Sequence, residues 1–124
     1  MRFAVFALAA AVPLAGVAAP VQAQEATRVS SAAITTGDYA DAEKVLMREL
    51  RIHPGRPELL LNLAAVYAHT GRADQARALY RQVLAQENVL MDMRNQSSFG
   101  SHALAEAGLR RLDRREASPA TAAN

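Results

Sequence analysis

The sequence lacks cysteine and tryptophan, and only 5% of its residues are aromatic. Without cysteine, the chain can form no disulfide, no thiolate metal site, no thiol nucleophile and no lipid-modified N-terminal cysteine. The chain also lacks a large excess of either charge, because it has 14 basic and 12 acidic residues. The composition therefore gives no reason to expect nucleic acid or an acidic membrane as a partner. The chain has 124 residues, of which 51% are hydrophobic and 21% are charged, and this length and composition are typical of one globular domain.

Motifs that carry chemistry are lacking as well. The six glycines are scattered, so no phosphate-binding loop can be recognised. No two of His53, His69 and His102 have the i, i+4 spacing of metal ligands, and we interpret all three as surface residues. Serines near His102 could suggest a nucleophile, but without an elbow motif they are typical of a loop and a helix cap, namely Ser97, Ser98 and Ser101. We predict no enzyme activity, no cofactor and no metal.

The N-terminus has the pattern of an export signal. Arg2 precedes an apolar, alanine-rich run over residues 3–17 that Pro13 interrupts, and residues 21–23 form a small-x-small cleavage motif. We predict a signal peptide over residues 1–23, cleaved on export to the periplasm or the medium, with no stable membrane insertion afterwards. The alternative is an uncleaved anchor, because an apolar stretch of this length can cross a bilayer. The proline and the missing positive flank favour cleavage.

Apolar periodicity predicts helices after the signal. Residues 25–36 are only weakly helical, because β-branched and hydroxyl residues dominate them. Gly37 and Asp38 are expected to end this helix and to cap the next one. That next helix carries a stripe of apolar residues together with one glutamate, which comprises Ala42, Val45, Leu46, Glu49, Leu50 and Ile52. The turn at residues 53–57 contains two prolines and ends it.

Two further helices follow, over residues 58–70 and from about residue 73 to 88. Pro57 suits the first turn of the first, and Gly71 ends it. The predicted inner face of the first of these helices comprises Leu60, Leu63, Ala64 and Tyr67, and Leu59 and Val66 widen it. The predicted inner face of the second comprises Ala76, Leu79, Tyr80, Val83 and Leu84. The short connection predicts that the two helices lie antiparallel.

The same pattern occurs twice. An offset of about 34 residues, the period of a helix-turn-helix repeat, aligns Thr36 with Thr70 and Gly37 with Gly71. It also aligns Ala42 with Ala76 and Leu50 with Leu84. The second copy resembles one complete tetratricopeptide repeat in Leu60, Asn62, Leu63, Ala64, Tyr67, Gly71, Ala76, Tyr80 and Leu84. The first resembles the latter half of another in Gly37, Asp38, Tyr39, Ala42, Leu46, Leu50 and Pro54.

This resemblance to the tetratricopeptide repeat family implies an all-α fold, in which antiparallel helix pairs form a short α-solenoid. Residues 24–88 would form two pairs, the first degenerate, because Ala33 stands where the repeat expects an aromatic residue such as Tyr67. In this family the first helix of each pair lines a concave groove for peptides. The matching face here comprises Thr27, Ser31, Thr35, Glu58, Leu61, Asn62, Ala65 and His69. We predict that these residues bind the partner.

The chain beyond residue 88 departs from the repeat. Residues 89–100 are predicted to be a loop, in which Met91, Met93 and Phe99 either form an adaptable binding patch or, as we favour, pack back over the helix ends. Residues 101–116 are predicted to form a capping helix, with Ser101 as N-cap and Ala105, Leu109 and Leu112 as a narrow stripe beside Gly108. Residues 117–124 are predicted to be a disordered tail.

The capping helix ends in an arginine cluster, which comprises Arg110, Arg111, Arg114 and Arg115. Arginine suits phosphate oxygens, so the cluster could bind phosphate, anionic lipid or nucleic acid. Because Asp113 and Glu116 dilute it, we favour a solvated helix end.

The function predicted from these features is a non-enzymatic protein–protein interaction module or adaptor of the bacterial cell envelope. The alternative is a structural homo-oligomer, such as a homodimer, whose groove is filled by its own chain or a sister chain. A core of about two helix pairs gives self-association a physical motive, since about three repeats are usually needed for stability.

Overall fold

In a computed structural model of the protein, the described residues are 33–93 and 96–118. The predicted signal peptide, most of the weak helix over residues 25–36, and residues 119–124 lie outside them, as do Thr27 and Ser31 of the predicted binding face. Residues 33–36 are helical.

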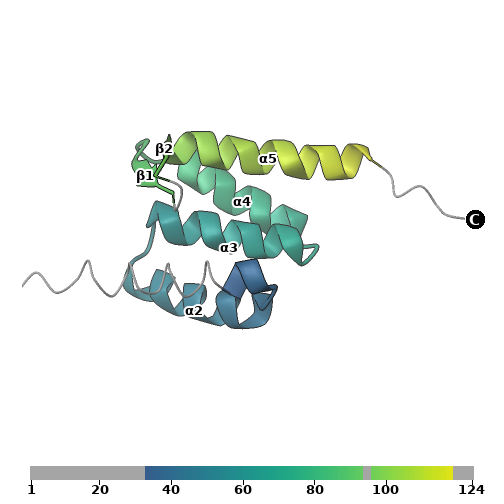
Figure 1. The fold of residues 1–124 in the computed structure, drawn as a ribbon, viewed down its shortest axis with the longest axis horizontal. Helices are drawn as coiled ribbons and strands as arrows, with labels where there is room; N and C mark the ends of the chain where they lie inside the picture. Colours follow the sequence, from purple (N-terminus) through teal and green to yellow (C-terminus); the bar gives the residue numbers. More distant parts are fainter. Residues whose placement is uncertain (1–32, 94–95, 119–124) are drawn as a thin grey trace, which may run out of the picture.

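The described chain forms helices α2 (Tyr39–Ile52), α3 (Pro57–His69) and α4 (Ala73–Leu84), then a hairpin of β1 (Leu90–Asp92) and β2 (Ser98–Gly100), and finally α5 (Ser101–Ala117). Figure 1 shows the helices stacked in chain order, each packed on the next, and α5 also contacts α3. This arrangement confirms the predicted all-α fold of packed helix pairs. No helix of residues 33–93 and 96–118 is long and apolar enough to span a bilayer.

Glycines at equivalent positions of the two copies make the turns. Gly37 and Gly71 have φ of 81° and 77°, a region that side-chain-bearing residues rarely adopt. The backbone N–H of Asp38 donates to the Ala33 carbonyl at 2.8 Å, and that of Arg72 donates to the Tyr67 carbonyl at 2.8 Å. Each glycine thus lets the chain satisfy the last free carbonyls of one helix before the next helix begins.

Asp38 occupies the N-cap position of α2, but its side chain makes no capping hydrogen bond, so the predicted cap is wrong. Its φ of −84° and ψ of 66° lie outside the extended region in which a cap side chain reaches the free N–H groups.

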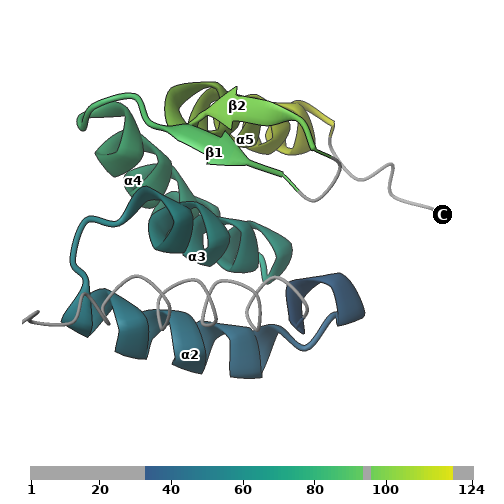
Figure 2. The ribbon, with the colours of Figure 1, turned by 60° about the vertical axis from the view of Figure 1, so that its left-hand side comes forward.

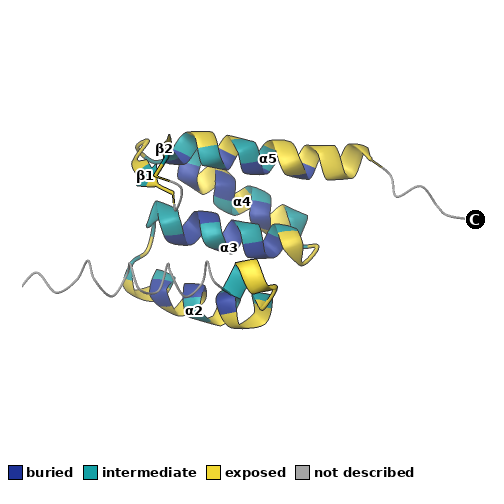
Figure 3. Cartoon of the chain, viewed as in Figure 1, coloured by how far each residue is buried: buried dark blue, intermediate teal, exposed yellow. Residues whose placement is uncertain are grey.

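The core fills the interfaces between neighbouring helices of the stack, with α3 buried along most of its length and the second half of α5 mostly exposed (Figure 3). It comprises Ala42, Leu46, Leu59, Leu60, Leu61, Leu63, Ala64, Val66, Tyr67, Ala76, Tyr80, Val83, Ala105 and Leu112. Ile52 does not extend the stripe of α2 as predicted, because 62% of it is exposed. At about 100° per residue it lies roughly a quarter turn from the line through Ala42 and Leu46.

The segment predicted to be a loop instead contains an antiparallel hairpin, in which Met91 pairs with Phe99 and Asp92 with Ser98 (Figure 2). The Ser98 hydroxyl donates to Asp92 Oδ1 at 2.6 Å, across the pair. Of the three apolar residues considered for this segment, Met91 packs on the core, whereas Met93 and Phe99 are 42% and 47% exposed. Packing back over the helix ends therefore holds for Met91 alone.

The N-terminus of α5 is capped differently from the prediction. Gly100 occupies the N-cap, and Ser101 is the first helical residue, fully buried, with its hydroxyl accepting the Val89 N–H at 3.0 Å. The capping acceptor comes from outside the helix, because Asn88 Oδ1 accepts the His102 backbone N–H at 3.1 Å. A Cβ on Gly100 would lie 2.6 Å from that oxygen, so a larger residue there would push the Asn88 side chain out of this position.

Small Gly108 allows α5 to approach α4 closely. It is buried, and a Cβ there would overlap the Tyr80 ring. The ring of Tyr80 therefore occupies the space that a side chain at residue 108 would need.

Candidate partner-binding site

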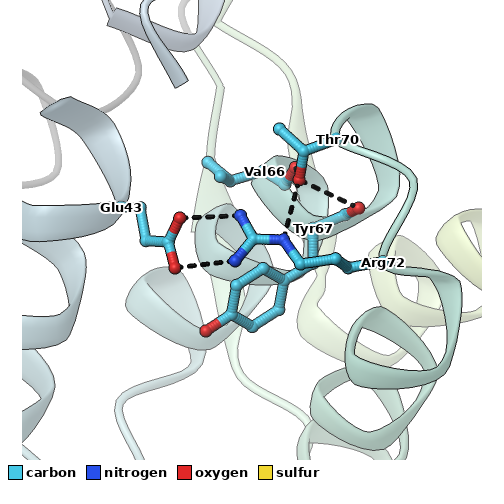
Figure 4. Close-up of polar contacts among 5 residues, drawn as sticks. All are labelled: Glu43, Val66, Tyr67, Thr70 and Arg72. Atoms are coloured by element: carbon cyan, nitrogen blue, oxygen red, sulfur yellow. Dashed lines mark hydrogen bonds and ion pairs between the residues drawn. The ribbon is translucent and has the colours of Figure 1, made fainter. Parts of the chain in front are cut away.

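The two repeat copies are joined by Arg72, in the turn between α3 and α4. Its Nη1 and Nη2 donate to the two carboxylate oxygens of Glu43 on α2 at 2.8 and 2.6 Å. Its guanidinium carbon lies 4.3 Å from the centre of the Tyr67 ring, and Nε donates to the Thr70 hydroxyl at 3.1 Å (Figure 4). Hydrogen bonds from Arg72 lower the pKa of Glu43. A fork-to-fork ion pair of this kind fixes the direction of both side chains, so it holds the first copy in register with the second.

A second link between the copies lies at the same end of α3. The rings of Tyr39 and His69 stack with their centres 5.3 Å apart and their planes within 11°. His69 was predicted to face a partner, and the structure shows that it also contacts α2 through this ring.

A hollow of about 280 Å³ lies between α3, α4 and α5. Its lining comes from all three helices and comprises Ala65, Ala68, His69, Tyr80, Gly108, Arg111, Leu112 and Arg115. Ala65 and His69 belong to the predicted binding face. The residues from α5 do not, because sequence spacing alone could not tell which helix would lie beside α3.

Arg77 of α4 binds the acidic side chains of α5 that lie near the hollow. Its side chain is only 17% exposed, and it donates to Asp113 at 2.7 Å and to Glu116 at 2.8 Å. These are the two acids that were expected to dilute the arginine cluster. Among the described residues no carboxylate lies within ion-pair distance of Arg111 or Arg115. Arg115 Nη1 instead donates to the Ala68 carbonyl at 2.9 Å.

Tyr80 contributes a polar group to the wall of the hollow. Burial raises its pKa, and the nearby charges of Arg111 and Arg115 partly oppose this shift. Within residues 33–93 and 96–118 its hydroxyl forms no hydrogen bond. The hollow therefore combines apolar walls, a phenol and two guanidinium groups.

The other residues of the predicted face are dispersed. Leu61, predicted to bind the partner, is only 8% exposed and belongs to the core, so its side chain offers a partner little surface. Central α3 is covered on more than one side, which widens its buried arc beyond one stripe. Glu58 and Asn62 are half-buried, and Thr35 is exposed. Contact of these residues with a partner stays a prediction.

The residues weighed for catalysis have structural contacts. His102 Nε2 lies 2.7 Å from the Gln86 carbonyl, which can only accept, so this nitrogen donates. Ser98 bonds to Asp92 and Ser101 to the Val89 backbone, so neither hydroxyl is paired with His102. Across the two described segments, no group of three or more His, Asp or Glu side chains could hold a metal ion.

Comparison with known families matches residues 33–89 to the tetratricopeptide repeat. Residues 33–89 belong to the tetratricopeptide repeat family. This region runs from the last turn before Gly37 to the start of the hairpin, so α5 lies beyond the match. None of the curated proteins and none of the solved structures compared with the chain matches it. Tetratricopeptide repeats generally mediate protein–protein interaction and are typically non-catalytic, so protein partners are indicated.

Proposed function

We propose that this protein is a non-catalytic interaction module of the bacterial cell envelope, which binds a polypeptide in the hollow between α3 and α5. The observation that carries the proposal is that Ala65 and His69, on the first helix of the complete repeat, line a hollow that α5 closes from the other side. Concave sites between packed helices are where bundles and solenoids hold their ligands. The N-terminal export pattern supports an envelope location, and the balanced overall charge supports a protein partner in preference to nucleic acid.

Site-specific photo-crosslinking in cells tests the binding face. A photoreactive amino acid replaces Ala65, and in a matched control it replaces Gln82, which is exposed on α4 and does not line the hollow. A polypeptide crosslinked from residue 65 and not from residue 82 supports the proposal. Equal yields from both positions would overturn the assignment of the face.

Cell fractionation tests the location. Periplasmic or secreted protein that begins at Gln24 is expected after removal of residues 1–23. Protein that begins at Met1, or that stays in the cytoplasm, would contradict export.

A second candidate, a homo-oligomer, is favoured by the apolar surface of the hairpin. Leu90 is 75% exposed and Phe99 is 47% exposed, and Val89 and Met93 are each 42% exposed. Exposed apolar side chains within one short segment can mark an interface. Light scattering of the exported protein separates the candidates, because a monomer at all concentrations excludes the homo-oligomer. A dimer that Phe99→Ser dissociates supports it.

A further inference from the structure

We propose that the hollow between α3 and α5 takes an acidic side chain of the partner polypeptide, next to an apolar one, with Arg111 and Arg115 binding the carboxylate. This inference rests on the proposed function, because it names the chemistry of the partner at the same site.

Two arginines of α5 lie together beside the hollow. Arg111 and Arg115 are one helical turn apart on α5, so their side chains lie on the same face, and both line the hollow. Both are exposed, and within the described segments neither has a carboxylate partner. Two adjacent guanidinium groups without a counter-charge favour an anion between them.

The neighbouring acids of α5 are paired elsewhere. Asp113 and Glu116 lie in the same stretch of α5 and would neutralise the arginines if they turned the same way. Arg77, itself mostly buried, holds both of them toward α4. The positive charge of α5 is thereby concentrated on the side of the hollow.

The walls of the hollow are largely apolar. Ala65, Ala68 and Leu112 are apolar, and Gly108 adds no side chain. The hydroxyl of Tyr80, which forms no hydrogen bond to residues 33–93 or 96–118, supplies a donor within the same wall. A volume of about 280 Å³ suits one or two side chains of an extended peptide and is too small for a folded element. Apolar walls beside paired cations fit a carboxylate that is flanked by an apolar residue.

The shape disfavours an anionic membrane as the occupant. A bilayer surface contacts protruding cations, whereas these arginines border a recess whose walls are apolar. Of the other two arginines of the cluster, Arg110 pairs with Glu106 at 3.6 Å, and neither Arg110 nor Arg114 lines the hollow. A membrane-binding surface would be expected to use all four.

The test uses the exported protein and a short peptide of glutamate and leucine, acetylated and amidated so that it has no terminal charge. A matched peptide carries glutamine in place of glutamate. Binding is followed by titration and by NMR shifts of the Ala65 and Ala68 amides. We expect the glutamate peptide to shift these amides and to bind roughly tenfold or more tightly than the glutamine peptide.

Variants of α5 locate the charge that matters. Arg111→Glu is expected to weaken binding of the glutamate peptide by roughly tenfold or more, and Arg111→Gln by less. Arg114→Glu is the matched control, because it changes the net charge equally but lies outside the hollow, and it is expected to leave binding nearly unchanged. Thermal melting of each variant verifies the fold, and Arg111 is preferred to Arg115 because it makes no hydrogen bond in the described segments.

Three outcomes would overturn the inference. The first is equal binding of the two peptides, and the second is equal loss from Arg111→Glu and Arg114→Glu, which indicates unspecific attraction. The third is binding to phosphatidylglycerol vesicles with no binding of the peptide, which identifies a membrane surface instead. If crosslinking from residue 65 still captures a polypeptide and Arg111→Glu does not change its yield, the proposed function stands and the acidic partner is excluded. If no polypeptide is captured but the peptide binds as expected, the failure belongs to the proposed function.

Discussion

Arg72 donates two hydrogen bonds, of 2.8 and 2.6 Å, to the carboxylate of Glu43, although the two residues belong to different repeat copies. The same guanidinium lies over the Tyr67 ring, so one side chain joins the turn of the complete repeat to the helix of the degenerate one. A chain with so few repeats has few interfaces between repeats, so each contact across such an interface contributes a large share of the stability.

Replacing Arg72 should loosen this link. Arg72→Ala is expected to lower the melting temperature, and Arg72→Lys to lower it by less, because lysine keeps the charge but loses the fork and the stacking. A double-mutant cycle with Glu43→Gln should show a favourable coupling that weakens as salt is added. Lys44→Ala is the control, because the pair of Lys44 with Asp41 is highly exposed and should contribute little. A cycle with no coupling would show that the two side chains act independently.

The same pair predicts a dependence on acid. Arg72 holds the pKa of Glu43 below its ordinary 4.5, so folding is favoured by the ionised carboxylate. This contribution is fully present above the unfolded pKa and is lost as the pH falls through the lower, folded pKa. Melting curves of the wild type and of Glu43→Gln should therefore differ most near neutral pH and converge below about pH 4. A difference that stays constant through this range would contradict the role of the Glu43 charge.

Gly108→Ala should destabilise the packing of α4 and α5. In an exposed helix this change would stabilise by about 1 kcal/mol, but here the added methyl meets the Tyr80 ring. We expect a net loss of about 1–3 kcal/mol in the free energy of unfolding, measured with urea. Tyr80→Leu in the same chain should restore part of the loss. A stabilised Gly108→Ala variant would show that the two helices are not in close contact.

Ala76→Leu tests the seam between α3 and α4. Ala76 is fully buried, so a larger side chain should overpack the seam and cost about 1–3 kcal/mol. Ala78→Leu, on the exposed side of the same helix, is the matched control and should change the stability little. Equal effects of the two variants would contradict the buried seam.

Asn88→Ala should destabilise the first turn of α5. The variant loses the acceptor for the His102 N–H, and loss of a helix cap costs about 1 kcal/mol. Asn88→Asp keeps an acceptor oxygen and should retain most of the stability. Hydrogen exchange should be faster at the His102 amide in the alanine variant alone, and unchanged exchange would exclude capping by Asn88.

Local signals in the sequence predicted the helices well, because they act over a few residues. Gly37, Gly71 and Pro57 mark helix ends through the backbone angles that they allow or impose, and apolar spacing marked most of each buried stripe. The hairpin escaped prediction because strands of three residues are too short to show an alternating pattern.

For the binding site, residue spacing along α3 is enough to place Ala65 and His69 on one face, because a helix sets its own side-chain directions. It could not determine that Leu61 is buried or that α5 lies beside α3. The packing of α5 on α4 is what lets Arg77 hold Asp113 and Glu116 toward α4 and leaves Arg111 and Arg115 at the hollow. This separation of acidic from basic side chains depends on contacts between residues far apart in the chain, so no local sequence pattern could predict it.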